Sequence, residues 1–170
     1  GFMATVNGSL PGILRRPSGY AGVWGWITTV DHKRIGVLYF GTAIFFFFVA
    51  GVEALLIRTQ LASPDSSLIT PEVYNQLFTM HALSMVFLVI MPLSVAFFNL
   101  IIPLQIGARD VAFPRLNSLS YWVYLFGAII FNLGWFTGGA ASAGWFAYAP
   151  LTENAYSVTM GMEFYVLGLL

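Results

Sequence analysis

The chain has 170 residues, of which 58% are hydrophobic and only 8% are charged, with seven basic residues balanced by seven acidic ones. Soluble domains carry roughly 25% charged residues, so this composition excludes a soluble domain. It predicts an integral membrane protein that is embedded in the lipid bilayer. A net charge of zero and the lack of a basic tract predict no nucleic-acid partner. The chain has no cysteine, which excludes disulfides, thiolate metal sites and haem attached through Cys-x-x-Cys-His.

The hydrophobic segments predict an all-α, polytopic bundle of transmembrane helices. Residues 1–34 are expected to form an N-terminal segment outside the bilayer, and residues 35–170 a transmembrane domain. A helix needs about 20 apolar residues to cross the hydrocarbon core, and segments 35–57, 77–102 and 119–139 satisfy this requirement. A fourth apolar segment, 156–170, is too short to span, so we expect the chain to be the front of a longer protein. Pro92 predicts a kink in the second span.

The distribution of basic residues predicts the orientation of these helices, because Lys and Arg are enriched in cytoplasmic loops. Only Arg58 falls in the loops that follow the first and third spans. The other six basic residues fall on the opposite side: Arg15, Arg16, Lys33, Arg34, Arg109 and Arg115. The N-terminus is therefore predicted to be cytoplasmic, with the loops 59–76 and 138–156 on the outer face.

His81 is the strongest candidate for a functional residue. It lies in a segment, 73–108, that contains no Asp, Glu, Lys or Arg. Neutral imidazole is a strong ligand for iron, copper and zinc, and ionisable groups at membrane depth usually mark a site. An intramembrane histidine can equally be a hydrogen-bonding partner between helices, and the residues alone leave both possibilities open. The predicted span places His81 about one turn from its outer end, and Asn99 roughly 27 Å deeper.

Several segments, in order and spacing, resemble the catalytic subunit (subunit I) of A-type haem–copper terminal oxidases. They are TTVDHKRIG at 28–36, LLIR at 55–58, FTMH at 78–81, PLQIGARDVAFPRLN at 103–117 and, more loosely, GWFAYAPL at 144–151. The resemblance implies that the chain carries the first three helices, and the start of the fourth, of a subunit of about twelve helices.

The resemblance assigns haem-binding roles to four residues. His81 matches the axial ligand to the iron of the low-spin haem, haem a, although the family usually has Gly where this chain has Ala82. Arg58 matches the donor to the haem formyl group, where a hydrogen bond tunes potential and spectrum; by itself it would be an arginine that snorkels to the interface. Trp145 and Tyr148 fall in an outer loop that packs near the haem propionates in the family, although aromatic residues are common at this interface.

A second set matches the family's proton-uptake channel. Asp110 matches the acid at its mouth, and the other members are Asn99, Asn117, Tyr39 and His32, with Ser120 as a neighbour. A surface carboxylate collects protons, and neutral amide and hydroxyl groups order a file of water without trapping the proton as a further charge would. From spacing alone, Asp110 would be a solvated loop acid and the asparagines would be helix caps.

The resemblance implies a proton-translocating cytochrome c oxidase of a bacterial plasma (inner) membrane, which reduces O₂ to water. Its partners would be cytochrome c, a copper-bearing subunit II and subunit III. The high-spin haem and CuB are expected in the part of the protein beyond Leu170.

Three alternatives differ in mechanism. Quinol-oxidising members place a carboxylate where this chain has Glu53, and Gln76 fits their pattern, whereas Val49 and Val73 do not. A proton-coupled secondary transporter could use His81 and Glu53 in its substrate path. A cytochrome b-like electron carrier would need further intramembrane histidines.

Overall fold

The computed structural model describes residues 22–170 except 154 and 158. The regular secondary structure of the described residues is entirely helical, with no strand. Residues 1–21, which include Arg15, Arg16 and most of the expected N-terminal segment, lie outside the described residues. The elements are α1 (Val23–Ile27), α2 (His32–Gln60), α3 (Pro71–Leu83), the π-helix η1 (Ser84–Ile90), α4 (Met91–Gln105), α5 (Pro114–Asn132), the 3₁₀-helix η2 (Leu133–Phe136) and α6 (Gly161–Leu169).

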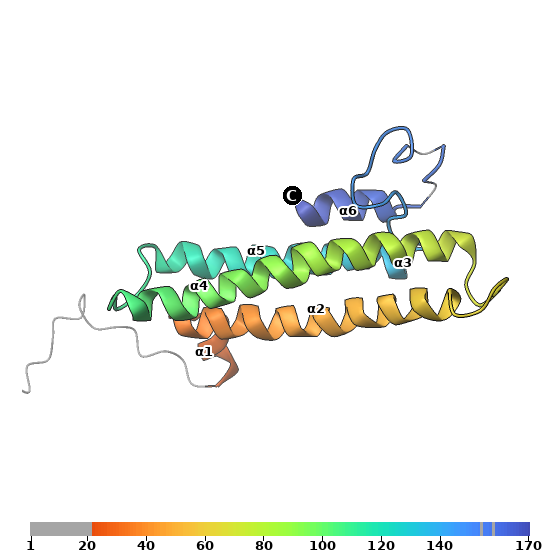
Figure 1. Cartoon of the computed structure of the whole chain (residues 1–170). Coiled ribbons are helices and arrows are strands. Elements are labelled where there is room, and N and C mark those ends of the chain that lie inside the picture. Colours follow the sequence, from red (N-terminus) through yellow and green to blue (C-terminus); the bar gives the residue numbers. More distant parts are fainter. Residues whose placement is uncertain (1–21, 154, 158) are drawn as a thin grey trace, which may run out of the picture.

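Three long rods form the body of the structure (Figure 1). They are α2, the continuous run α3–η1–α4, and α5 with η2. All three are long and apolar enough to cross a membrane, with 29, 35 and 23 residues respectively. The short helix α6 lies beside α5 and follows the loop 138–156, which we call the outer loop after the side predicted for it. The predicted all-α, polytopic helical bundle is confirmed.

The first two rods begin earlier than the apolar segments predict, because capping side chains stabilise their polar first turns. Asp31 accepts a 3.0 Å hydrogen bond from the Lys33 amide at the start of α2, and Thr70 accepts one of 3.4 Å from Val73 in α3. These are the usual N-cap contacts. As a result, His81 lies ten residues after Pro71, about 15 Å along the helix, and not one turn from its end.

The other predicted bounds also shift by a few residues. The third rod covers Pro114–Phe136 where 119–139 was expected, and α6 begins at Gly161 where the apolar segment begins at 156. Hydropathy does not mark helix ends: a helix can begin in polar residues, and an apolar segment can begin in a loop.

Two prolines interrupt the hydrogen-bond ladder of the second rod. Pro92 was expected to kink it; the structure has the π-helix η1 just before Pro92, which is buried in the first turn of α4. Proline lacks an N–H and its ring clashes with the carbonyl four residues earlier, and a π-helical stretch relieves that crowding. The helix also continues past Pro103 to Gln105.

The buried side chains form two clusters along the bundle. The larger one joins α2, α3, η1 and α5 to the outer loop and α6, and includes Met80, Leu83, Ala140 and Tyr165. The smaller one joins α2, α4 and α5. His81 follows directly after Met80 of the larger cluster, and Tyr39 belongs to the smaller one. The two sets of candidate residues therefore lie at different levels of one bundle.

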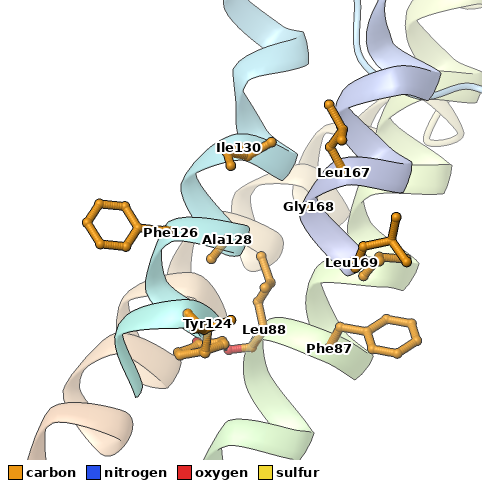
Figure 2. Close-up of a pocket in the computed structure, with 12 residues that line it drawn as sticks. Phe87, Leu88, Tyr124, Phe126, Ala128, Ile130, Leu167, Gly168 and Leu169 are labelled. Atoms are coloured by element: carbon orange, nitrogen blue, oxygen red, sulfur yellow. The ribbon is translucent and has the colours of Figure 1, made fainter. Parts of the chain in front are cut away.

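A pocket of about 410 Å³ lies between η1, α5 and α6 (Figure 2). Its lining is apolar, with Phe87, Phe126 and Leu169 among the side chains that surround it. None of the site residues predicted from the sequence lines this pocket, although Tyr124, on which Tyr39 stacks, does.

Candidate functional site

His81 is held by its Nδ1 atom. This nitrogen lies 2.9 Å from the carbonyl oxygen of Ala50 on α2. A carbonyl oxygen only accepts, so Nδ1 carries the proton and donates, which leaves Nε2 with a free lone pair. Histidines that bind metals usually donate their other ring N–H in this way. The two interpretations of His81, helix–helix partner and ligand, are therefore compatible, because they use different nitrogens.

In the described part of the chain, His81 is a single candidate ligand and not one member of a cluster of metal ligands. Among the described residues, no group of three or more His, Cys, Asp or Glu side chains could hold a metal ion. Haem iron needs only axial ligands from the protein, so one histidine suffices. The residue after His81, Ala82, lines a cavity of about 280 Å³ together with Trp145 from the outer loop. The structure therefore brings Trp145 to the helical turn that carries His81.

Two polar side chains on the His81 helix hold the outer loop. The Thr79 hydroxyl is buried, donates to the Asn75 carbonyl at 2.7 Å and accepts from the Gly144 amide at 2.9 Å. The Gln76 side-chain oxygen accepts from the Ala140 amide at 3.1 Å. Sequence reasoning missed Thr79, although it is a polar residue in the uncharged segment two positions before His81.

Among the described residues, no recorded hydrogen bond or ring contact joins Arg58 or Tyr148 to His81. Arg58 lies exposed in the last turn of α2. Tyr148 is 71% exposed and packs against Phe146, with 5.1 Å between ring centroids. Arg58 stands at the end of α2 that precedes the loop to α3, and Tyr148 and Trp145 belong to the segment between η2 and α6.

The residues predicted for the proton channel, apart from Asp110, are joined by hydrogen bonds at the other end of the bundle. The Asn117 amide donates to the Asn99 side-chain oxygen at 2.7 Å. The Ser120 hydroxyl donates to the Asn117 carbonyl at 2.7 Å and, having spent its proton there, accepts from the Tyr39 hydroxyl at 3.1 Å. His32 Nδ1 donates to the Asn99 carbonyl at 2.7 Å. This polar network connects α2, α4 and α5.

Asp110 stands apart from the polar network. It lies half-buried in the loop between α4 and α5, where its Oδ1 accepts from the Val111 amide at 2.9 Å. The structure records no hydrogen bond between this carboxyl group and Asn99 or Asn117 in the described part of the chain. Any proton passed from Asp110 to the network would therefore need water between them.

A cluster of tyrosines continues from the polar network into the bundle. Tyr39 stacks on Tyr124 at 5.4 Å and meets Tyr121 edge-on at 5.1 Å. Tyr121 in turn bonds to the Thr42 hydroxyl at 3.0 Å. Sequence reasoning singled out Tyr39 alone; the spacing of Tyr121 and Tyr124 in α5 is a helical i, i+3 pair that could have drawn attention to the other two.

Glu53 is a buried carboxyl group on the same face of α2 as Ala50. Its exposed fraction is 5%, and its Oε2 has no hydrogen-bond partner among the described residues. Trp135 of η2 is its polar neighbour. Buried carboxyl oxygens are normally bonded, so Oε2 is free to bind a group that the described residues do not supply.

Comparison with known proteins identifies the family of this chain. The family model described as cytochrome c and quinol oxidase polypeptide I matches residues 34–170. The chain belongs to this oxidase family. It is 50% identical to cytochrome c oxidase subunit 1 of Bacillus subtilis over 147 residues, which are 86% of this chain and 23% of that protein.

Other bacterial relatives carry both electron-donor names. A putative cytochrome c oxidase subunit 1-beta of Streptomyces coelicolor is 53% identical over 85% of this chain and 25% of its own length. Quinol oxidase subunit 1 of Bacillus subtilis is 46% identical over 85% of this chain and 22% of its own. The chain thus spans about a quarter of the length of these family members. The family match and the three candidate spans agree with a membrane protein of this family.

Proposed function

We propose that this chain is part of subunit I of a bacterial cytochrome c oxidase and that His81 binds a low-spin haem through Nε2. The observation that carries the proposal is the hydrogen bond from His81 Nδ1 to the Ala50 carbonyl. It fixes the tautomer and the ring orientation, and donation from the opposite nitrogen makes Nε2 a stronger base toward iron.

The haem, when bound, supplies one-electron transfer. The chain's contribution is to hold His81 in one orientation and to shape the space beside it. Thr79 and Gln76 fix the outer loop to the His81 helix, and through that loop they fix Trp145. Arg58, with Tyr148, completes the proposed haem-facing set on the outer side, where the Arg58 guanidinium would donate to a ring substituent and tune the potential.

At the inner side we propose that Asp110 collects protons and delivers them through ordered water to the polar network of Asn99, Asn117, Ser120 and Tyr39. The network's hydrogen bonds run in a consistent direction, from the Tyr39 hydroxyl to Ser120 and from Ser120 to the Asn117 carbonyl. Neutral groups of this kind can order water without fixing a charge. The N-terminus would then be cytoplasmic, and proton uptake would serve O₂ reduction and outward pumping.

The complete enzyme would include components that this chain does not contain. We propose cytochrome c as the electron donor, a copper-bearing subunit II and subunit III as partners, and a high-spin haem with CuB held by other segments of subunit I. The cytochrome c oxidase names among the relatives support this choice of donor.

Quinol is the second candidate donor, and Glu53 is the observation that favours it. Its free Oε2 could accept from a quinol hydroxyl. The Gln76 side chain, which also fits the quinol pattern, instead has its oxygen bonded to the outer loop. Reduction of the low-spin haem by cytochrome c in the purified complex would favour the first donor, and reduction only by a quinol would favour the second.

The test of the haem site compares the only two histidines of this chain. In the full-length assembly, His81→Ala should abolish the low-spin haem band in the dithionite-reduced minus oxidised spectrum. His32→Ala should keep that band, because His32 lies in the polar network. A low-spin band that survives His81→Ala, or no haem in the unaltered assembly, would contradict the proposal.

A further inference from the structure

His32 is in an unusual position for a channel residue. Its side chain is 1% exposed, and the Nδ1 atom donates a 2.7 Å hydrogen bond to the backbone carbonyl of Asn99, 67 residues away. A group that passes protons needs contact with water or with other proton carriers. The geometry of His32 instead suggests that it serves the backbone of α4.

The Asn99 carbonyl needs a donor because of Pro103. In an α-helix the carbonyl of residue i accepts from the N–H of residue i+4, and for Asn99 that residue is Pro103, which lies inside α4 and has no N–H. Asn99 is buried, with 6% exposed, and a buried backbone carbonyl without a partner is costly. His32 supplies the missing donor from the neighbouring helix.

The helices α2 and α4 lie close enough near His32 for its hydrogen bond to the Asn99 carbonyl. Gly36, one turn after His32, faces α4: a β-carbon there would meet the Leu100 side chain at 2.7 Å and the Ala96 carbonyl oxygen at 3.2 Å. The absence of a side chain at Gly36 therefore lets the two helices lie together where His32 reaches across.

The side chain of Asn99 is oriented by the same helical turn. Its amide donates to the Val95 carbonyl at 3.0 Å, and its oxygen accepts from Asn117 at 2.7 Å. If the Asn99 backbone shifted to find another donor, the bond to Asn117 would change with it. The backbone donor at His32 and the side-chain contact between the two asparagines are thus mechanically linked.

We propose that His32 is a positioning residue: its Nδ1–H takes the place of the backbone N–H that Pro103 lacks, and thereby holds Asn99 against Asn117. Its effect on turnover rests on the proposed uptake route, whereas its effect on the stability of α4 does not.

Replacing His32 by Asn or by Gln tests which of its two ring nitrogens is needed. In the full-length oxidase, His32→Asn places an N–H donor where Nδ1 stands, and His32→Gln places one where Nε2 stands. We expect His32→Asn to retain turnover and melting temperature. His32→Gln and His32→Phe should lower the melting temperature and reduce turnover about fivefold, the factor for one hydrogen bond of ordinary strength. Equal losses in His32→Asn and His32→Gln would overturn the proposal.

Pro103→Ala provides an independent test, because it restores the backbone N–H. The loss of melting temperature caused by His32→Phe should shrink when Pro103→Ala is also present. An undiminished loss in the double variant would overturn the proposal. Failure of the proposed uptake route would give a different result from failure of this inference. Asp110→Asn would then turn over normally, while the coupling between His32 and Pro103 in melting temperature would still be observed.

Discussion

The hydroxyl group of Tyr124 donates a 3.0 Å hydrogen bond to the carbonyl of Leu88, four residues before Pro92 (Figure 2). In a regular α-helix this carbonyl would accept from residue 92, which here has no N–H. Leu88 lies in the π-helix η1, and Tyr124 of α5 donates to its carbonyl across the bundle, as His32 of α2 donates to the carbonyl of Asn99.

Removing this hydroxyl group should destabilise the bundle. Tyr124→Phe keeps the ring that stacks on Tyr39 but loses the donor, at a cost of about 1 kcal/mol for a hydrogen bond between helices in a membrane. The thermal melting temperature of the solubilised full-length oxidase should fall. Tyr156→Phe, at a 65% exposed position in the outer loop, is the control and should melt like the unaltered protein. Equal melting of both variants would mean that the Leu88 carbonyl does not depend on Tyr124.

The outer loop should loosen when Thr79 loses its hydroxyl group. Thr79→Val keeps the shape of the side chain but leaves the buried Gly144 amide without its acceptor, which costs roughly 1–3 kcal/mol. Since each 1.4 kcal/mol is a factor of ten, hydrogen exchange at that amide should accelerate roughly 5- to 150-fold. Thr79→Ser retains the acceptor and should exchange slowly. Rapid exchange in both variants would show that the methyl group, and not the hydroxyl, holds the loop.

Arg58 should tune the haem rather than only anchor α2 at the interface. Arg58→Met removes the donor to the ring substituent and so reduces electron withdrawal. The low-spin haem band should shift and its reduction potential should fall, as measured by spectroelectrochemistry. Arg115→Met changes a basic residue at the start of α5, far along the chain from the haem-facing set, and should leave both unchanged. An unshifted band in Arg58→Met would leave Arg58 as a snorkelling residue.

Asp110 should limit the rate of proton uptake. Asp110→Asn keeps an oxygen that can accept from the Val111 amide but cannot carry a proton, so O₂ consumption should slow at least tenfold while the haem bands stay intact, in line with the 10²–10⁴-fold worth of a positioned proton-transfer group. Asp65→Asn alters a loop acid between α2 and α3 with φ of 56°, a conformation that Asn tolerates. It should turn over normally. Normal turnover in Asp110→Asn would remove Asp110 from the route.

Close contact between α5 and α6 depends on two glycines. A β-carbon at Gly127 would lie 2.7 Å from the Gly168 carbonyl oxygen, and one at Gly168 would lie 2.6 Å from the Phe131 β-carbon. Gly127→Ala should therefore destabilise the bundle by about 1–3 kcal/mol through overpacking. Gly41→Ala in α2 meets nothing within 4 Å and should be neutral or slightly stabilising. A lower melting temperature in Gly41→Ala than in Gly127→Ala would contradict this packing.

Much of the architecture could be predicted because it depends on local composition. Apolar segments of sufficient length identified the three rods, and the uncharged segment around His81 identified a histidine that bonds to the neighbouring helix α2. The bounds were less accurate, because the caps Asp31 and Thr70 begin their helices in polar sequence that hydropathy does not count.

The partners of the candidate residues could not be predicted. Nothing near His81 in the sequence indicates that the Ala50 carbonyl accepts its hydrogen bond, and nothing near Thr79 indicates that it holds Gly144, because these pairs are 31 and 65 residues apart. Such contacts depend on how the helices are rotated and how closely they approach.

The sequence by itself therefore determined that the chain has helices able to span a membrane, which family it resembles and which side chains are candidates for a functional role, since these follow from composition and from residue order. Only the tertiary structure decided which nitrogen of His81 and of His32 is the donor, and that His32 serves the carbonyl freed by Pro103. The physical reason is that a carbonyl left free by proline must find a donor within hydrogen-bond distance, and in a helical bundle that donor comes from whichever helix packs against it.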